Sequence, residues 1–316
     1  MKLLLPDSVD LSALTLPAGV TGLPYAVSEP IPDDHADADF LVVWGNPGDQ
    51  LRDAASRLSR LRWVQTLAAG PDMVIAAGFP PSVVITSGGG LHDLTVAEHA
   101  LALILAAARE LPKLTRAQIG HRWAAESGGL RPVRDPDHFR TLRDAHVVIW
   151  GFGGIAATLA SYLSMLGARV TGVARSAGER HGFPVETEAA LPSLLPTTDV
   201  LINILPATAA TEKIVDAAVL GLLPPKAWFV NVGRGATVDE EALLAALRSG
   251  RLAGAALDVF SVEPLPVSSG LWDEPNVIIT PHAAGGRPLG AAELIRSNLE
   301  ALLDGRPLRN VVERTR

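Results

Sequence analysis

Three side chains in the second half of the sequence could together carry out acid–base chemistry on a carboxylic acid. Arg234 has a planar guanidinium that can bind a carboxylate through two parallel hydrogen bonds. His282 can give or take a proton near neutral pH, and Glu263 could accept a hydrogen bond from its other ring nitrogen and favour the charged ring. A single histidine or arginine is more often a packing or surface residue, so the elements that position these side chains decide their meaning.

A glycine-rich turn after the apolar run Val147–Trp150 organises this region. Gly151, Gly153 and Ala156 fill the three small positions of the G-x-G-x-x-G/A dinucleotide-binding fingerprint. Gly151 allows the tight turn, Gly153 lets the backbone approach a pyrophosphate, and Ala156 keeps the following helix, expected over Ile155–Leu166, close to its strand. Because the first N–H groups of that helix would face the phosphates, we also expect cofactor contacts from Phe152, Gly154 and Ile155.

The rest of this half alternates short β-prone runs with helical or loop segments, which is typical of a doubly wound parallel sheet. The expected strands are Val147–Trp150, Arg169–Ala174, Val200–Leu205, Trp228–Val232, Ala255–Phe260 and Val277–Thr280. Ligands of such sheets bind outside the carboxyl ends of the strands. The residues there are Gly151 to Gly153, Arg175, Pro206, Arg234, Asp258 with Glu263, and His282. This set suits reduction of a 2-oxo acid, with Arg234 for the carboxylate, His282 for the proton and a nicotinamide for the hydride.

The first part of the chain predicts a smaller open α/β layer. Its β-prone runs are Leu3–Leu5, Phe40–Trp44, Trp63–Thr66 and Val83–Thr86, with a weaker candidate at Tyr25–Val27. A helix is expected over Asp49–Leu61. The acidic run Pro32–Asp39 lacks the spacing and turn glycine of a calcium loop, so we interpret it as a solvated loop and expect no metal site.

A long helix is expected to begin near Thr95, which would be its N-cap, with Glu98 completing a capping box. From Val96 to Ala108 this helix is apolar almost all round, so it needs cover from a domain junction or a second subunit. Another amphipathic helix is expected over Pro288–Leu303, after which the tail could return to the first domain.

Composition bounds the class of protein. The 316 residues suffice for about two domains, and 48% hydrophobic against 19% charged residues describe a globular protein with a large core. A net charge of -7 disfavours nucleic-acid and anionic-membrane partners. The absence of cysteine excludes disulfides and thiolate metal sites. Neither a signal peptide nor a membrane-spanning run is expected, so we predict a cytoplasmic protein.

Several motifs in order resemble the D-isomer-specific 2-hydroxyacid dehydrogenase family. They are Asn231–Gly235, Leu257–Pro266 and Asn276–Ala283 together with Gly151–Ala156, and also Gln65–Gly70, Val96–His99 and Leu205–Thr208, so that the resemblance covers nearly the whole chain. The resemblance implies that Arg234, Glu263 and His282 form the catalytic triad and that Asp258 lies on the nicotinamide side. It also implies a backbone cradle for the substrate carboxylate, formed by Leu67, Ala68, Ala69 and Gly70, and cofactor contacts at Pro206, Val232 and Gly233.

The resemblance further implies the architecture. A Rossmann nucleotide-binding domain of residues 96–287 would be joined to a smaller, flavodoxin-like α/β domain that binds substrate and is made of residues 1–95 plus 288–316. A homodimer would be built on the helix Val96–Ala108. Trp123 could cover the pocket or simply pack, and we interpret His99 as structural.

The end of the second nucleotide-domain strand bears on the choice of cofactor. NAD-using members of the family carry an acidic residue there to bind the ribose hydroxyls, whereas this chain has Ala174 followed by Arg175 and Ser176, with Arg180 close behind. No carboxylate would repel a 2′-phosphate, and Arg175 could pair with one. The sequence therefore predicts a preference for NADP, with relaxed use of NAD as the alternative.

Trp44 bears on the choice of substrate. Similar phosphoglycerate dehydrogenases usually place an arginine near this position to meet the substrate phosphate, so Trp44 indicates a small uncharged tail, as in glyoxylate and hydroxypyruvate reductases. Another arginine could still reach the site, namely Arg60, Arg62, Arg122 or Arg131. The alternatives are an NAD-linked D-3-phosphoglycerate or other 2-hydroxyacid dehydrogenase and, from a different class, a non-catalytic dinucleotide-sensing adaptor.

Overall fold

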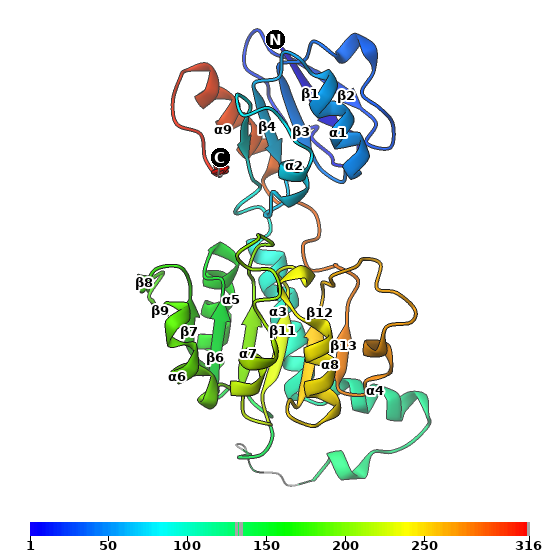
Figure 1. Cartoon of the computed structure of the whole chain (residues 1–316), viewed down its shortest axis with the longest axis vertical. Coiled ribbons are helices and arrows are strands. Elements are labelled where there is room, and N and C mark those ends of the chain that lie inside the picture. The colour runs from blue at the N-terminus through cyan, green and yellow to red at the C-terminus, as the bar shows by residue number, and fades with distance from the viewer. Residues whose placement is uncertain (130–131, 133–134, 315–316) are drawn as a thin grey trace. The chain divides into compact units, whose positions relative to one another are not determined.

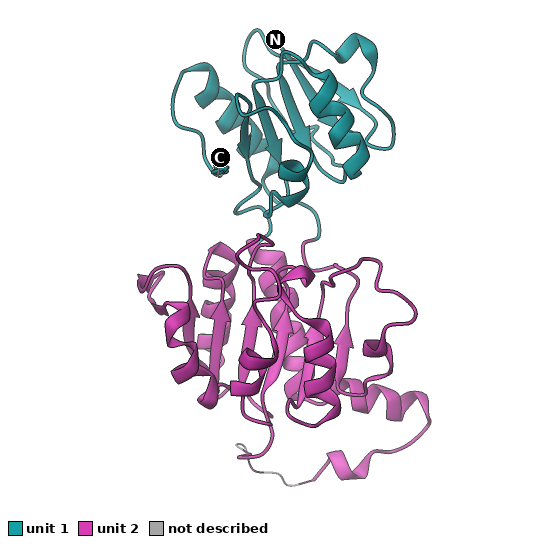
Figure 2. Cartoon of the chain, viewed as in Figure 1, with its two compact units in different colours: residues 1–92, 286–316 teal, residues 93–285 magenta. Residues whose placement is uncertain are grey.

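The computed structural model describes residues 1–129, 132 and 135–314, which fall into two compact units (Figure 2). The smaller unit consists of residues 1–92 and 286–316, and the larger unit of residues 93–285. These limits differ by two or three residues from the predicted domain boundaries, 1–95 with 288–316 and 96–287. The assignment of substrate binding to one unit and dinucleotide binding to the other stays a prediction.

Five parallel strands form the sheet of the smaller unit, in the order β2-β1-β3-β4-β5. They are β1 (Lys2–Pro6), β2 (Thr21–Tyr25), β3 (Phe40–Val43), β4 (Trp63–Thr66) and β5 (Val84–Thr86). This order is that of the flavodoxin-like doubly wound fold, as predicted. The weak strand expected at Tyr25–Val27 lies earlier, because it pairs along the whole length of β1 from Thr21 to Tyr25.

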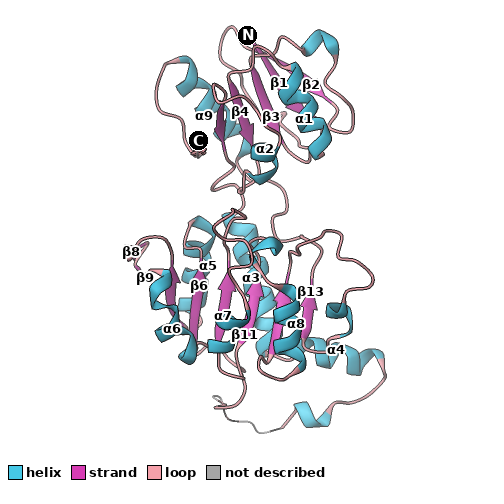
Figure 3. Ribbon diagram, viewed as in Figure 1, coloured by secondary structure: helices cyan, strands magenta, loops and turns pink. Residues whose placement is uncertain are grey.

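Helices cover both faces of this sheet (Figures 1 and 3). α1 (Gly48–Arg57) and α2 (Asp72–Ala76) pack on one face through Leu51 and Val74. α9 (Ala291–Leu303) packs on the other through Leu294, Ile295 and Leu299. The chain then returns along β5, where Val311 forms an antiparallel bridge with Thr86. The two ends of the chain therefore build one unit, with a short 3-10 helix η1 (Asp33–His35) in its acidic loop.

Eight strands form the sheet of the larger unit, in the order β13-β12-β11-β10-β6-β7-β9-β8. They are β6 (His146–Trp150), β7 (Arg169–Val173), β8 (Gly178–Arg180), β9 (Phe183–Glu186), β10 (Val200–Asn203), β11 (Trp228–Asn231), β12 (Gly254–Leu257) and β13 (Val277–Ile279). All neighbours are parallel except β8 and β9, and the order reverses between β6 and β10 as in a Rossmann fold. The six expected strands are present. β8 and β9 were missed because they are short and largely exposed.

Helices also lie on both faces of the larger sheet (Figure 1). α3 (Asp93–Ala108) and α5 (Gly154–Met165) share one core with the strands, while α6 (Leu191–Leu194), α7 (Ala217–Leu222) and α8 (Glu240–Arg248) share the other. α4 (Leu111–Ile119) follows α3. The 3-10 helices are η2 (Ala125–Ser127), η3 (Glu188–Ala190), η4 (Leu195–Thr197), η5 (Gly235–Thr237) and η6 (Gly270–Asp273). In the described part of the chain, none of the helices has the length and apolarity that crossing a bilayer requires.

Two predicted helix starts are wrong. α3 begins at Asp93 rather than after Thr95, because Thr95 lies inside the first turn and its hydroxyl donates to the carbonyl of Gly285 (2.8 Å) instead of capping the helix. α9 begins at Ala291 rather than Pro288, because Gly290 precedes it in the left-handed region with φ 79°.

Candidate active site

The strand ends of the larger unit are aligned by the register of the sheet. Trp150 pairs with Val173 and Asn203, and the row continues through Asn231 and Leu257 to Ile279. The predicted site residues follow these ends directly at one edge of the sheet, and they are Gly151, Arg175, Pro206, Arg234, Asp258 and His282. The structure therefore places the predicted set along the edge where open parallel sheets bind ligands.

His282 and Glu263 are in direct contact. Nδ1 of His282 lies 2.8 Å from Oε2 of Glu263, and Oε1 of the same carboxylate accepts a hydrogen bond from the amide of Phe260 (2.9 Å). The carboxylate is thus held by the backbone of its own loop and orients the ring. About half of the His282 side chain remains exposed (48%). With Nδ1 engaged, Nε2 is the ring nitrogen left to exchange a proton with a ligand.

The loop that carries Arg234 is held against the loop that leads to Glu263. A Cβ at Gly235 would lie only 1.8 Å from the carbonyl carbon of Phe260 and 2.3 Å from the amide nitrogen of Ser261, so only glycine permits this approach. The Arg234 side chain is half-buried, and its Nη1 donates to the carbonyl of Gly233 (2.8 Å). Close backbone packing therefore sets the position of the Arg234 backbone relative to the Glu263 loop.

A buried polar cluster that sequence analysis did not identify supports the Arg234 loop. Asn203 and Asn231, the last residues of β10 and β11, bond side chain to side chain (3.0 Å), and Asn203 also donates to Thr237 (2.6 Å). The Thr237 hydroxyl and the Asn231 amide both donate to the carbonyl of Arg234 (2.6 and 3.2 Å). The signal in the sequence was the polar residue that ends each of two apolar strand runs, Val-Leu-Ile-Asn and Trp-Phe-Val-Asn.

The glycine turn after β6 fits a dinucleotide. Gly151 has φ 97°, and a Cβ there would lie 2.7 Å from the carbonyl oxygen of Ile204, so the turn is accessible to glycine alone. A Cβ at Gly153 would meet nothing within 4 Å, which leaves open space beside the start of α5. The Phe152 ring packs on β7 at Gly172, so the backbone of Phe152 rather than its ring can face a ligand. The first N–H groups of an α-helix are suited to bind a pyrophosphate, and α5 begins directly after this turn.

Two arginines lie in the segment after β7. Arg175 is exposed. Arg180, on β8, donates through Nη2 to the carbonyl and hydroxyl of Ser176 (3.0 and 2.7 Å) and through Nη1 to the carbonyl of Phe152 (3.3 Å). A guanidinium therefore links this turn to the glycine turn, and the acidic residue typical of NAD binding is replaced by Ala174.

The remaining predicted cofactor contacts lie near these loops. Pro206 follows β10 and is exposed, whereas Val232 is 7% exposed. A Cβ at Gly233 would lie 2.8 Å from the carbonyl oxygen of Leu205, so the β10 and β11 loops touch through their backbones.

The predicted substrate residues Trp44 and Leu67–Gly70 belong to the smaller unit. The Trp44 ring stacks on the buried ring of His92, with centroids 5.3 Å apart and an interplanar angle of 20°. Nε2 of His92 lies 2.8 Å from the carbonyl oxygen of Leu67, and the amide of Gly88 donates to the carbonyl of Ala68 (2.8 Å). The first carbonyls of the predicted cradle are therefore engaged within this unit.

Three of the four alternative arginines have partners of their own. Arg60 lies 3.6 Å from Asp39, Arg62 stacks 5.7 Å above the Phe40 ring, and Arg122 pairs with Glu126 (2.7 Å). Arg131 lies outside the described residues.

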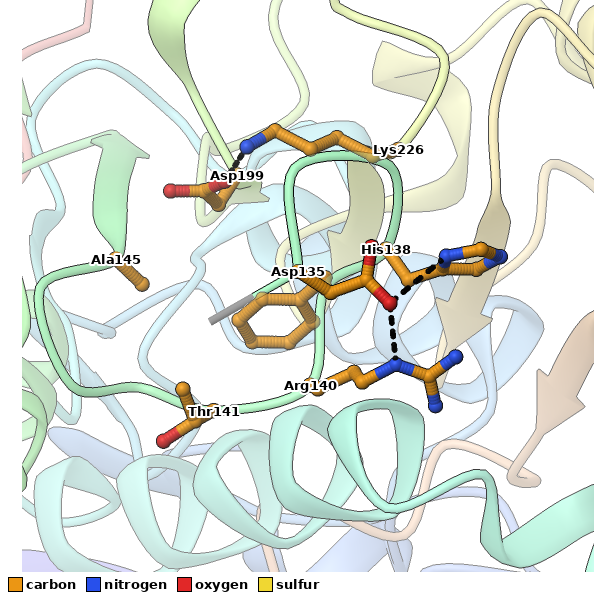
Figure 4. Close-up of a pocket in the computed structure, with 8 residues that line it drawn as sticks. Asp135, His138, Arg140, Thr141, Ala145, Asp199 and Lys226 are labelled. Carbon is orange, nitrogen blue, oxygen red and sulfur yellow. Dashed lines mark hydrogen bonds and ion pairs between the residues drawn. The ribbon is translucent and has the colours of Figure 1, made fainter. Parts of the chain in front are cut away.

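A small pocket lies at the opposite ends of the strands, next to the residues that precede β6, β10 and β11 (Figure 4). Its charged side chains are paired, Arg140 and His138 with Asp135 (2.9 and 3.2 Å) and Lys226 with Asp199 (2.9 Å). The hydrogen bond from Arg140 lowers the pKa of the Asp135 carboxyl. Because these charges compensate one another, the pocket is a structural ion-pair cluster rather than a second candidate site.

Comparison with known proteins identifies the family. A sequence model described as D-isomer specific 2-hydroxyacid dehydrogenase, NAD binding domain, matches residues 101–284. Glyoxylate/hydroxypyruvate reductase A of Klebsiella pneumoniae (strain 342) is 34% identical over 298 residues, which cover 90% of this chain and 88% of that protein.

Two solved structures are similar along nearly the whole chain. A D-isomer specific 2-hydroxyacid dehydrogenase from Xanthobacter autotrophicus Py2, in complex with NADPH and MES, is 32% identical with a TM-score of 0.82 over 99% of this chain and 98% of that one. An NADPH-dependent glyoxylate/hydroxypyruvate reductase from Sinorhizobium meliloti, in complex with NADP and sulfate, is 27% identical with the same TM-score and coverage. The chain therefore belongs to the family of D-isomer specific 2-hydroxyacid dehydrogenases, which are NAD(P)-dependent oxidoreductases.

Proposed function

We propose that this protein reduces small 2-oxo acids of the glyoxylate or hydroxypyruvate type to the corresponding D-2-hydroxy acids, with NADPH as the preferred reductant. The observation that carries this proposal is the contact between His282 and Glu263 at the sheet edge that also holds the glycine turn. The relatives named glyoxylate/hydroxypyruvate reductase support the substrate class.

Residues of the larger unit are assigned to successive parts of the cofactor. The backbone of Gly151–Ile155 would hold the pyrophosphate, and Pro206, Val232, Gly233 and Asp258 are assigned to the nicotinamide half of the cofactor. When bound, the reduced nicotinamide supplies the hydride. The open space beside Gly153 supports this assignment.

Proton transfer is assigned to His282. Nε2 donates a proton to the carbonyl oxygen of the 2-oxo acid while C2 receives the hydride, so that one hydroxyl and one C–H bond form together. Glu263 accepts the hydrogen bond from Nδ1 and stabilises the charged ring before it gives up the proton. Arg234 binds the substrate carboxylate and holds the carbonyl carbon in place. In the reverse direction His282 is the base.

The preference for NADPH is assigned to Arg175 and Ser176. In the absence of an acidic residue at Ala174, a guanidinium and a hydroxyl can bind the 2′-phosphate. Arg180 supports the turn by holding Ser176 in place. The NADPH and NADP in the solved relatives support this choice, and use of NAD is the alternative.

On the substrate side we assign Trp44 to the tail of the oxo acid and the backbone of Leu67, Ala68, Ala69 and Gly70 to its carboxylate. The indole in place of an arginine supports an uncharged tail. Its stacking on His92 fixes the ring in one orientation.

We also propose that the protein is a cytoplasmic homodimer. Leu94 and Leu105 on α3 remain 44% and 37% exposed, and Trp123 beyond α4 is 92% exposed. A second copy covering this apolar surface would account for the all-round apolarity of α3. Light scattering of the purified protein measures the oligomeric state.

The test of the proposed activity is a panel of initial rates. Glyoxylate, hydroxypyruvate, pyruvate and phenylpyruvate are each offered with NADPH and with NADH, and 3-phosphohydroxypyruvate is added to detect a phosphoglycerate-type enzyme. We expect the highest kcat/KM with NADPH and either glyoxylate or hydroxypyruvate. Tight NADPH binding without turnover of any oxo acid would contradict the proposal and favour a sensing role.

A further inference from the structure

Asp258 is a fully buried carboxylate that binds the loop carrying His282. Its side chain is 0% exposed, and Oδ1 accepts hydrogen bonds from the hydroxyl of Thr280 (2.6 Å) and the amide of Ala283 (2.8 Å). Oδ2 accepts one from the amide of Ala284 (3.0 Å). The backbone carbonyl of Asp258 accepts one from the amide of His282 (2.7 Å). One residue at the end of β12 therefore binds the chain on both sides of His282.

This binding holds His282 in an uncommon backbone conformation. His282 has φ 51°, in the left-handed region that non-glycine residues rarely adopt and that persists only where the surroundings enforce it. The hydrogen bonds from Ala283 and Ala284 to Asp258 provide that enforcement directly after the residue. The position of the imidazole thus depends on how firmly Asp258 is itself held.

His99 on α3 contacts both Thr280 and Asp258. Its Nε2 lies 3.0 Å from the hydroxyl oxygen of Thr280 and 3.3 Å from Oδ1 of Asp258, and its side chain is 23% exposed. A carboxylate only accepts hydrogen bonds, so the single hydroxyl hydrogen of Thr280 is directed at Asp258 and its lone pair at His99. Nε2 of His99 therefore carries a hydrogen and donates it.

We propose that His99 is a positioning residue for the reaction: it donates to Thr280 and Asp258, which together hold the loop of His282 in its reactive conformation. The sequence was interpreted as giving His99 a structural role, and its contacts with Thr280 and Asp258 are the basis for assigning it this positioning role. The inference deepens the proposed function and rests on it for its kinetic readout. Asp258 and His99 are titratable members of this network, and Glu263 faces the titratable ring of His282.

Three variants test the inference. His99→Met removes the donor at similar volume, His99→Gln retains a side-chain N–H that can reach the same acceptors, and Thr280→Val removes the bridging hydroxyl with its shape kept. Glu98→Gln, on the exposed side of the same helix, is the matched control. For each variant we measure kcat, KM for the oxo acid, NADPH binding by fluorescence titration, and thermal unfolding.

Loss of the donor should lower kcat about ten-fold, as expected for one hydrogen bond to a charged group, with NADPH binding changed less than about two-fold. His99→Gln should recover most of the rate, and the double variant His99→Met with Thr280→Val should be no slower than either single variant. Multiplicative losses in the double variant, an unimpaired His99→Met, or a His99→Gln as slow as His99→Met would overturn the inference.

Amide hydrogen exchange separates this inference from the proposed activity. His99→Met should speed exchange at Ala283 and Ala284 about ten-fold while the amides of the core strands keep their protection. This result would support the network even if the wild-type protein reduced none of the oxo acids, an outcome that would refute the proposed function alone. Uniformly faster exchange throughout the larger unit, or no change at these two amides, would overturn the positioning role.

Discussion

Gly235 offers a direct perturbation of the candidate site, because its hydrogen atom faces the backbone of a neighbouring loop. An ideal Cβ at this position would lie 1.8 Å from the carbonyl carbon of Phe260, 2.1 Å from its oxygen and 2.3 Å from the nitrogen of Ser261. None of these is the end of a flexible side chain, so Gly235→Ala must move one loop away from the other. The loops in question carry Arg234 and Glu263.

The size of the effect follows from the distances. Carbon atoms pack at about 3.5 Å, so the Phe260 backbone and the new methyl group must separate by about 1.7 Å. Insertion of a methyl into a well-packed region typically costs about 1–3 kcal/mol of unfolding free energy, which lowers the Tm of a unit of this size by about 2–12 °C. A misplacement of about 1 Å in a site can cost about 100-fold in rate. We therefore expect kcat/KM to fall by about 100-fold or more.

The assay pairs thermal unfolding with steady-state reduction of glyoxylate, measured well below the Tm of the variant. Gly221→Ala is the matched control, because its Cβ would meet nothing within 4 Å and the residue lies within the helix α7. Alanine there should raise stability by about 0.5–1 kcal/mol and leave the rate unchanged. A Gly235→Ala protein as stable and as active as wild type would refute the claim that this backbone contact sets the position of Arg234.

Three further predictions follow from the same structure. Gly153→Ala should leave the Tm unchanged, since a Cβ there has open space, but weaken NADPH binding about ten-fold or more because the methyl group would face the pyrophosphate, as measured by fluorescence titration. Arg175→Ala should raise the KM for NADPH about 10-fold to 100-fold, while the KM for NADH changes little. Equal increases in the two KM values would contradict the assignment of Arg175 to the 2′-phosphate. Burial, together with the charge of Arg169, lowers the pKa of His146 below its usual value of 6.5. Below about pH 6.5 the unfolded chain therefore binds more protons at this residue than the folded protein does. The stability that neutral His146 contributes is complete above about pH 6.5 and is lost as the pH falls through the lowered pKa. His146→Gln should therefore make the fall in Tm between about pH 7 and pH 5 less steep.

Local patterns predicted the parts of the fold whose residues are close in sequence. The run Val147–Trp150 is the core of β6, and the helix after the glycine turn ends before Gly167, which has φ 89° as a terminating glycine does. The alternation of apolar runs and helices was enough for the parallel sheet and for the edge at which Arg234 and His282 lie. These features depend on the burial of strands, and a buried strand can be recognised in the sequence as a short run of apolar residues.

Contacts between distant segments left no such trace. His99 and Thr280 are separated by 181 positions, and neither residue type alone indicates the other. The start of α3 was misplaced for a related reason, because the hydroxyl of Thr95 has a tertiary partner, the carbonyl of Gly285, which competes with its use as a cap. The hydrogen-bonded pair of Asn203 and Asn231 likewise becomes visible only when β10 and β11 are aligned in register.

The central claim is that His282 delivers the proton to a 2-oxo acid, and substitution of this residue tests it most directly. Single-turnover reduction of glyoxylate by NADPH is compared between the wild-type protein and His282→Gln, with NADPH binding measured on the same samples. A rate lowered by about 100-fold to 10,000-fold with unchanged NADPH binding is the predicted result, because general acid catalysis contributes about that much. A His282→Gln protein that reduces glyoxylate at the wild-type rate would contradict the account.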